Sequence, residues 1–205
     1  MPSPHPGGLA NNNVLTGVTA LSSSNAWAVG YYFKQGVAYR TLTVHWTGAS
    51  WQTAPSPNTG TPGDDNLLNA VAATPAGDMW AVGDVSDGTA DRTLTERRTG
   101  SGWTVVASPN PVTGPADIDV LTGVAATSAS NAWAVGTYSH NGVGRTLILR
   151  WNGTTWKTVP SPSPGGRTRE SVLTGVAASG ACSAWAVGCY DSAAIPAQTL
   201  ALHWG

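Results

Sequence analysis

Tryptophan stands beside a hydrogen-bonding side chain at the same position of several hairpin-like segments. An indole ring can stack on the C–H face of a sugar, while a neighbouring histidine or arginine donates hydrogen bonds to its hydroxyls. The residues that could bind a carbohydrate in this way are His45, Trp46, Trp51, Arg150, Trp151, Trp156, His203 and Trp204. Adjacent residues of an ideal strand face opposite ways, so each pair serves one site only where the strand twists or ends. The alternative interpretation is that these tryptophans pack inside the protein.

Arginine recurs at the start of another set of segments, each time before threonine. Arg40, Arg92 and Arg145 hold this position, and Gln198 replaces them in the last copy. A planar guanidinium matches a carboxylate or a sugar diol, which makes Arg40 and Arg145 further candidate ligand-binding residues. The alternative is structural: the arginine would bond carbonyl oxygens of connecting segments or stack on a neighbouring tryptophan.

Catalytic and metal-binding patterns are weak by comparison. The eleven carboxylates form no repeated pair, and the spacing of Asp84, Asp87 and Asp91 could hold calcium but lacks the order of an EF-hand. The four histidines have no metal-ligand spacing, and neither cysteine has a second cysteine two or three residues away. We therefore expect no catalytic residues, no metal, no cofactor and no enzymatic activity, with a solvated loop at Asp84 to Asp91.

The charge and tryptophan content of the chain indicate which kinds of partner and which location to expect. The 205 residues carry a net charge of −1, and the ten lysines and arginines are scattered, so we expect neither nucleic acid nor a membrane as partner. Ten tryptophans with few charges are typical of extracellular bacterial β proteins, which predicts a secreted protein, although the N-terminus lacks the pattern of a signal peptide. Cys182 and Cys189 lie seven residues apart across an expected strand, about 23 Å if extended, so two free thiols are expected.

An internal repeat organises these residues. Ala-Trp-Ala-Val-Gly occurs at 26–30, 132–136 and 184–188, and Met-Trp-Ala-Val-Gly at 79–83, so that successive tryptophans are 53, 53 and 52 residues apart. In this segment tryptophan alternates with small residues, which predicts that one large face packs on the small face of a neighbour. The tryptophans predicted to lie in the core are Trp27, Trp80, Trp133 and Trp185.

Each repeat offers four short stretches rich in Val, Thr, Leu, Trp and Tyr between Gly, Asn, Ser and Pro turns, which is typical of strands. The clearest hairpin spans 145–159 around Asn152 and Gly153. Four strands per repeat of about 52 residues predict an all-β fold, a β-propeller of four blades in a single domain, 1–205. The repeats are 14–66, 67–119, 120–171 and 172–205, with 1–13 closing the last repeat.

The last repeat has no copy of the fourth, tryptophan-bearing stretch. The favoured interpretation is a three-stranded blade in a ring that closes as a monomer. The alternatives are a homodimer in which a partner chain supplies the missing edge of this blade, and an eight-bladed ring formed by two chains of four blades. The second repeat differs as well, because Arg98 replaces the hairpin tryptophan and any repeated site is lost or altered there.

Thr137, Tyr138 and the segment 146–162, which reads Thr-Leu-x-x-Arg-Trp-Asn-Gly-Thr-x-Trp and ends in Pro-Ser-Pro, resemble tandem repeats of uncharacterised secreted bacterial β-propeller-like proteins. A looser similarity, carried by 42–51 and 202–205, is to bacterial propeller lectins, whose sugar sites lie between blades. The resemblance implies a propeller that binds glycan or polysaccharide at several sites. The alternative is a structural or protein-interaction module in which all repeated residues serve packing.

Overall fold

The computed structural model describes residues 2–100, 102–180, 182–195 and 197–205, and this part of the chain is all-β, as the sequence predicts. It contains no helix, and so none that is long and apolar enough to cross a membrane. The first repeat comprises β1 (Asn13–Ser22), β2 (Asn25–Lys34), β3 (Ala38–Trp46) and β4 (Trp51–Ala54). The second comprises β5 (Asp65–Ala73), β6 (Met79–Ser86), β7 (Asp91–Thr99) and β8 (Gly102–Val105). The third comprises β9 (Ile118–Ser128), β10 (Asn131–His140), β11 (Val143–Trp151) and β12 (Trp156–Thr158), and the last β13 (Ser171–Ala178), β14 (Ala184–Tyr190) and β15 (Gln198–Trp204).

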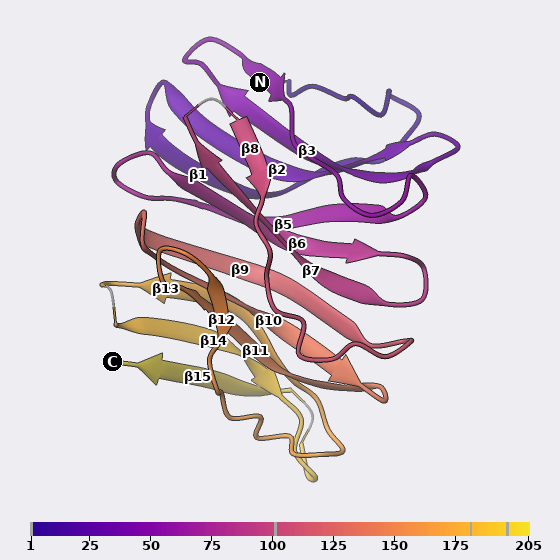
Figure 1. The fold of residues 1–205 in the computed structure, drawn as a ribbon, viewed down its shortest axis with the longest axis vertical. Helices are drawn as coiled ribbons and strands as arrows, with labels where there is room; N and C mark the ends of the chain where they lie inside the picture. Colours follow the sequence, from indigo (N-terminus) through magenta and orange to yellow (C-terminus); the bar gives the residue numbers. More distant parts are fainter. Residues whose placement is uncertain (1, 101, 181, 196) are drawn as a thin grey trace.

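Each repeat folds into its own antiparallel meander, with strands paired in chain order. A single parallel pairing, Asp91 with Ile118, joins the second sheet to the third. The sheets stack face to face from the N-terminus to the C-terminus, so the first and last repeats lie at opposite ends of the molecule (Figure 1). The described sheets do not close into a ring, and the predicted closure of four blades within one chain is therefore absent.

The N-terminal segment also differs from the expectation that 1–13 closes the last repeat. The backbone N–H of Gly7 donates to the Asn13 side chain (2.9 Å), and that of Phe33 in β2 donates to the Asn12 carbonyl (2.9 Å). These bonds tie the described part of the segment to the first repeat. The last repeat has three described strands, which agrees with the absence of the fourth, tryptophan-bearing stretch from its sequence.

The glycine of the repeated Trp-Ala-Val-Gly segment has a structural cause. In all four repeats the first strand shifts its register opposite this glycine, between Leu15 and Gly17 in the first repeat. The shift brings a backbone carbonyl of the first strand onto the space that a Cβ would need. The glycines in this position are Gly30, Gly83, Gly136 and Gly188. The repeat therefore requires a residue without a side chain here.

We expect Gly136→Ala to lower the free energy of unfolding by about 1–3 kcal/mol, because the added methyl must push β9 away from β10. Gly63→Ala is the matched control, since a Cβ at Gly63 meets nothing within 4 Å. Urea denaturation followed by tryptophan fluorescence measures both. Equal urea midpoints for the two variants would show that the Val120 carbonyl moves away from the added methyl group without loss of stability.

Adjacent repeats are also bonded through their first strands. The Thr16 hydroxyl donates to the Leu68 carbonyl (2.6 Å), and the Thr122 hydroxyl donates to that of Leu173 (2.7 Å). At the same position of the second repeat, the Asn69 amide donates to the Leu121 carbonyl (3.0 Å). The ends of all four first strands line one hollow of about 570 Å³. The stack is therefore an arc whose inner edge is formed by β1, β5, β9 and β13.

Candidate functional site

Each repeat sheet has two unlike faces. One face carries the tryptophan of the second strand and the valine two residues later; we call it the tryptophan face. The opposite face carries a leucine and a valine of the first strand and the aromatic residues of the third and fourth strands; we call it the acceptor face. In every contact between repeats, the tryptophan face of one sheet packs on the acceptor face of the next.

The contact between the second and third repeats shows how the two faces fit. Trp80 is fully buried, and its ring lies 4.8 Å from the ring of Trp151 and 4.8 Å from that of Trp156. Trp151 and Trp156 are themselves 5.9 Å apart and inclined at 55°. They form a slot on the acceptor face, and Trp80 of the preceding repeat fills it.

The other two contacts use the same positions with different residues. Trp27 lies against Trp103 (6.0 Å) and under the guanidinium of Arg98 (4.3 Å), which stands where the other repeats have tryptophan. Trp133 lies against Trp204 (6.2 Å) in the last repeat. Arg98 thus replaces an aromatic contact with a cation–π contact, and the aromatic pair is altered in the second repeat.

The acceptor face of the first repeat is uncovered. Leu15 is 41% exposed, whereas Leu68, Leu121 and Leu173 at the same position are buried. Val18 is 68% exposed, whereas its counterparts in the second and third repeats, Val71 and Val124, are buried. A hollow of about 390 Å³ opens on this face; Leu15, Val18, Ala28 and Trp51 form its apolar lining.

The uncovered face also carries an open copy of the aromatic slot. The rings of Trp46 and Trp51 are 5.8 Å apart and inclined at 51°, which reproduces the geometry of the filled pair in the third repeat. Trp46 Nε1 donates to the Ser23 carbonyl (3.1 Å), as Trp151 Nε1 donates to that of Ala129 (3.0 Å). Both residues are partly buried. The slot is therefore formed before anything occupies it.

The tryptophan face of the last repeat is uncovered in turn. Trp185 is 54% exposed and Val187 is 50% exposed, whereas the same two positions are buried in the other three repeats. His203 of the neighbouring strand stacks on one side of the Trp185 ring (4.3 Å, 26°). The other side of this indole is not covered by a following repeat. The prediction that all four tryptophans of this segment lie in the core is thus wrong for Trp185.

The histidine and arginine candidates lie on the tryptophan face, away from the tryptophan that follows each of them. His45 stacks on Trp27 (4.3 Å, 16°), and Arg150 lies over Trp133 (5.3 Å), because strand pairing places them opposite each other. His203 occupies the same position over Trp185. Alternation along the strand therefore separates the two halves of each predicted sugar-binding pair.

The remaining candidates have mixed surroundings. Trp151 and Trp156 are buried in the core, while Trp204 is half-buried against Trp133. Arg40 donates to the carbonyls of Pro62 and Asp64 in the connecting segment, and Arg92 donates to those of Asp91, Gly114 and Asp117. Arg145 lines a separate shallow hollow with Tyr138 and His140. The cysteines Cys182 and Cys189 are free, as predicted.

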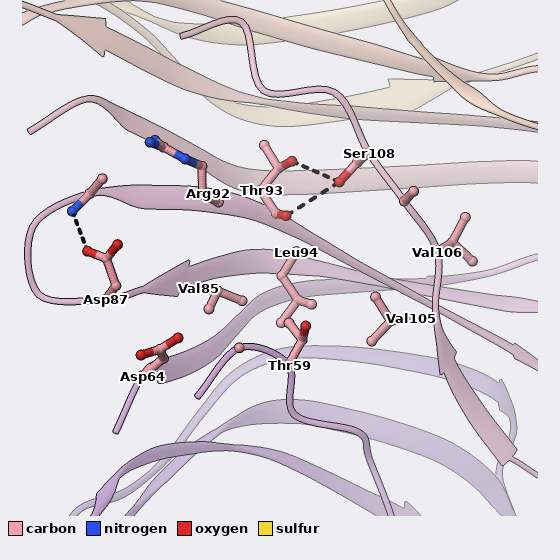
Figure 2. A pocket seen from close by; sticks show the side chains of 13 residues that line it. Thr59, Asp64, Val85, Asp87, Arg92, Thr93, Leu94, Val105, Val106 and Ser108 are labelled. Atoms are coloured by element: carbon pink, nitrogen blue, oxygen red, sulfur yellow. Dashed lines mark hydrogen bonds between the residues drawn. The ribbon is translucent and has the colours of Figure 1, made fainter. Parts of the chain in front are cut away.

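A hollow of about 360 Å³ lies between the first and second repeats (Figure 2). Its apolar floor consists of Val85, Leu94, Val105 and Val106. Asp64 and Asp87 stand at its rim and accept hydrogen bonds from their own turns, from Thr61 and from Thr89 and Ala90 respectively. Those bonds lower the pKa of both carboxyls, to about 2 for Asp87. Both are therefore ionised hydrogen-bond acceptors at neutral pH.

The contact between the first and second repeats encloses a carboxyl group. Glu96 is fully buried and accepts a hydrogen bond from the Ser56 hydroxyl (2.8 Å), while its Oε1 has no hydrogen-bond partner within the described residues. Burial raises the pKa of Glu96 to about 8, against the opposing effect of Ser56. Glu96 is therefore mostly protonated at neutral pH. The described residues contain no group of three or more His, Cys, Asp or Glu side chains that could hold a metal ion.

Trp185, Leu15 and Val18 were not among the residues singled out from the sequence as candidates for binding. The local motif of Trp185 is the same as that of Trp27 and Trp133, and only the absence of a following sheet distinguishes it. Leu15 and Val18 sit in strand patterns that recur in buried copies. Local patterns carry no signal for exposure that depends on the neighbouring repeat.

Comparisons with known proteins find a similar fold but indicate no activity. The sequence matches no known protein family, and no curated protein is similar to it. The structure is similar to a crystal structure of a protein of unknown function from Dyadobacter fermentans DSM 18053, with a TM-score of 0.55 at 12% sequence identity. The match covers 91% of this chain and 59% of that chain, so the chain spans less than two thirds of that protein. This likeness concerns the fold alone.

Proposed function

We propose that this chain is a protein-interaction module whose first repeat binds an aromatic side chain of another protein surface in the slot between Trp46 and Trp51. One observation carries the proposal: the open pair has the spacing and tilt of the pair that holds Trp80 inside the molecule. A site that is already shaped for its ligand loses little conformational entropy on binding.

The lining of the slot favours an apolar side chain over a sugar. Leu15, Val18 and Ala28 supply the adjoining surface, and the hydroxyl of Thr16 is already bonded to the Leu68 carbonyl. A sugar needs several free donors and acceptors around its hydroxyls, and a buried hydroxyl without a partner costs about 1–3 kcal/mol. An indole or phenyl ring has no such requirement, apart from one N–H in the indole.

The arrangement that presents this face is, in our proposal, an arc of a β-propeller. Three features support it: four-stranded meanders in the first three repeats, adjacent first strands, and a shared hollow at the ends of those strands. A propeller places the first strand of every blade at the axis and the last strand at the rim. The described chain supplies four such units.

Glycan binding is a second candidate, supported by the hollow in Figure 2. Asp64 and Asp87 are ionised acceptors at its rim, and carboxylates of this kind bond sugar hydroxyls. A hollow made of the same strand positions, with Thr41, Leu42, Thr53 and Ala54, recurs in the first repeat, where Ser56 and Asn58 are polar lining residues in place of carboxylates.

One titration separates the two candidates, with methyl groups as reporters in NMR spectra. The probes are N-acetyltryptophanamide and a mixture of common monosaccharides, and the protein carries Trp185→Ala so that its own exposed indole does not compete. We expect the indole probe to bind with millimolar affinity and to shift the methyl signals of Leu15, Val18 and Ala28.

The matched control is Trp51→Ala, which opens one wall of the slot and should abolish those shifts. Sugar-induced shifts at Val85, Leu94 and Val105 would favour the glycan candidate instead. If the indole probe leaves the methyl signals of the slot unchanged, the proposed function is wrong.

A further inference from the structure

The molecule itself exposes the group that the open slot accepts. Trp185 occupies in the last repeat the position that Trp80 occupies in the second, and it is exposed because no other described sheet packs on it. We propose that the partner of the first repeat is the last repeat of a second copy of this chain, with Trp185 of that second copy inserted between Trp46 and Trp51 of the first. This inference rests on the proposed function, since it names the partner of the same slot.

The match extends beyond the aromatic ring to the backbone. Inside the chain, each first-strand Thr or Asn bonds the leucine carbonyl of the next repeat. Thr174, the last in this series, is exposed, and within the described residues its hydroxyl donates to the Val187 carbonyl of its own sheet (3.4 Å). Leu15 is the first leucine of the series among the described residues, and it is 41% exposed. A head-to-tail contact would bring the Thr174 hydroxyl to the Leu15 carbonyl and complete the series.

Close approach of the two first strands is possible at the same place. Inside the chain, a Cβ at Gly17 would meet the backbone of Ala70 and Val71 of the next repeat at 3.0–3.3 Å. Gly123 meets Gly175 in the same way, at 3.3 Å. Gly175 itself has no following strand beside it; a Cβ there would meet only its own sheet, at Val187. The last repeat thus keeps the small residue that an inter-repeat contact needs.

The apolar residues at the two ends correspond to those that inner contacts bury. Val187 on the tryptophan face and Leu15 and Val18 on the acceptor face are each 41–68% exposed, while their counterparts in inner contacts are largely buried. Contiguous exposed apolar side chains of this kind mark interaction sites in soluble proteins. Both halves of one contact are therefore available on a single chain.

The symmetry of such a contact fixes the assembly. A tryptophan face on an acceptor face is a head-to-tail contact, which gives a closed ring when the rotation per copy allows it and a filament when it does not. Because the four sheets already curve around a common hollow, we expect two copies to close with two identical contacts. The product is a ring of eight repeat sheets.

Sedimentation velocity of the 205-residue chain tests this directly. We expect a dimer at tens of micromolar, and monomers for both Trp185→Ala and Val18→Glu. Each substitution alters a side chain that is more than half exposed in the single chain, so each variant should fold. Loss of one such contact should raise the dissociation constant at least about 30-fold.

Mixing the two variants is the decisive experiment. Trp185→Ala keeps an intact acceptor face, and Val18→Glu keeps an intact tryptophan face, so an equimolar mixture should form a heterodimer through one contact. The double variant should remain monomeric in every mixture. Circular dichroism and the denaturation midpoint of each variant confirm that loss of association is not loss of fold.

Three outcomes would overturn the inference: a monomeric parent chain, a dimer that survives Val18→Glu, or a mixture that stays monomeric. A monomeric parent whose slot still binds N-acetyltryptophanamide would leave the proposed function intact and reject only the second copy as partner. A dimer sensitive to both substitutions, in which the indole probe competes with assembly, supports both.

Discussion

Replacing Trp80 by alanine should cost about 3–5 kcal/mol of folding free energy, a third or more of the stability of an ordinary domain. The ring is fully buried and contacts Trp151, Trp156 and the guanidinium of Arg97 (5.5 Å). Its removal leaves a cavity between the second and third repeats, beside the rings of Trp151 and Trp156. Chemical denaturation followed by circular dichroism measures the loss.

Trp185→Ala is the control for this experiment, because it removes the same side chain from the same strand position. Trp185 is 54% exposed, so in dilute solution its loss should cost less than about 1 kcal/mol. The difference between the two losses of stability measures the contribution of burial by the following repeat, because the intrinsic preference of tryptophan for strands is the same at both positions. Equal losses for the two variants would mean that Trp80 is not held by the third repeat.

The repeat period and the four stretches of each repeat could be read from the sequence because strand and turn signals are local. Trp-Ala-Val-Gly predicted a strand with a large and a small face, and the structure adds that its glycine faces a carbonyl of the first strand. The hairpin around Asn152 and Gly153 also forms as predicted, with Gly153 at φ 101°. Arg40 and Arg92 bond connector carbonyls, which the sequence offered only as the structural alternative.

The binding surfaces could not be read in this way, because exposure depends on which repeat lies next door. Trp51 and Trp156 share one motif, yet Trp156 is buried and Trp51 is only partly buried. Whether the sheets close into a ring depends on the rotation between successive sheets. Long-range packing sets this rotation, so it cannot be predicted from any single motif. Glu96 is a similar case: Arg97 and Arg98 follow it in the chain, and only the strand alternation turns it into the contact with the first repeat.

That buried glutamate predicts an unusual dependence of stability on pH. The pKa of Glu96 rises from an ordinary value of 4.5 to about 8 on folding, so between those values the folded state holds a proton that the unfolded state has released. Stability must then fall as pH rises, by about 1.4 kcal/mol per pH unit, and level off above pH 8. Asp84, whose pKa burial raises to about 6, acts in the same direction below pH 6.

Groups whose pKa is lowered on folding oppose this trend without reversing it: His45, Asp64, Asp87 and Asp117. Burial and the charge of Arg98 lower the pKa of His45, so the folded state gains stability as pH rises through the ordinary range of histidine. The hydrogen bonds of Asp87 lower its pKa to about 2, which costs stability only at strongly acid pH. Since His45 is only partly covered, the slope of Glu96 should dominate between pH 5 and 8.

Glu96→Gln should remove most of this slope, because the amide keeps an acceptor for the Ser56 hydroxyl and carries no proton to lose. The variant should match the parent near pH 4.5 and exceed its stability at pH 8. Urea midpoints measured at half-unit intervals give both profiles, with Glu170→Gln as the exposed control that follows the parent. Parallel profiles for Glu96→Gln and the parent would show that the carboxyl is ionised in place, with water reaching Oε1 between the first two repeats.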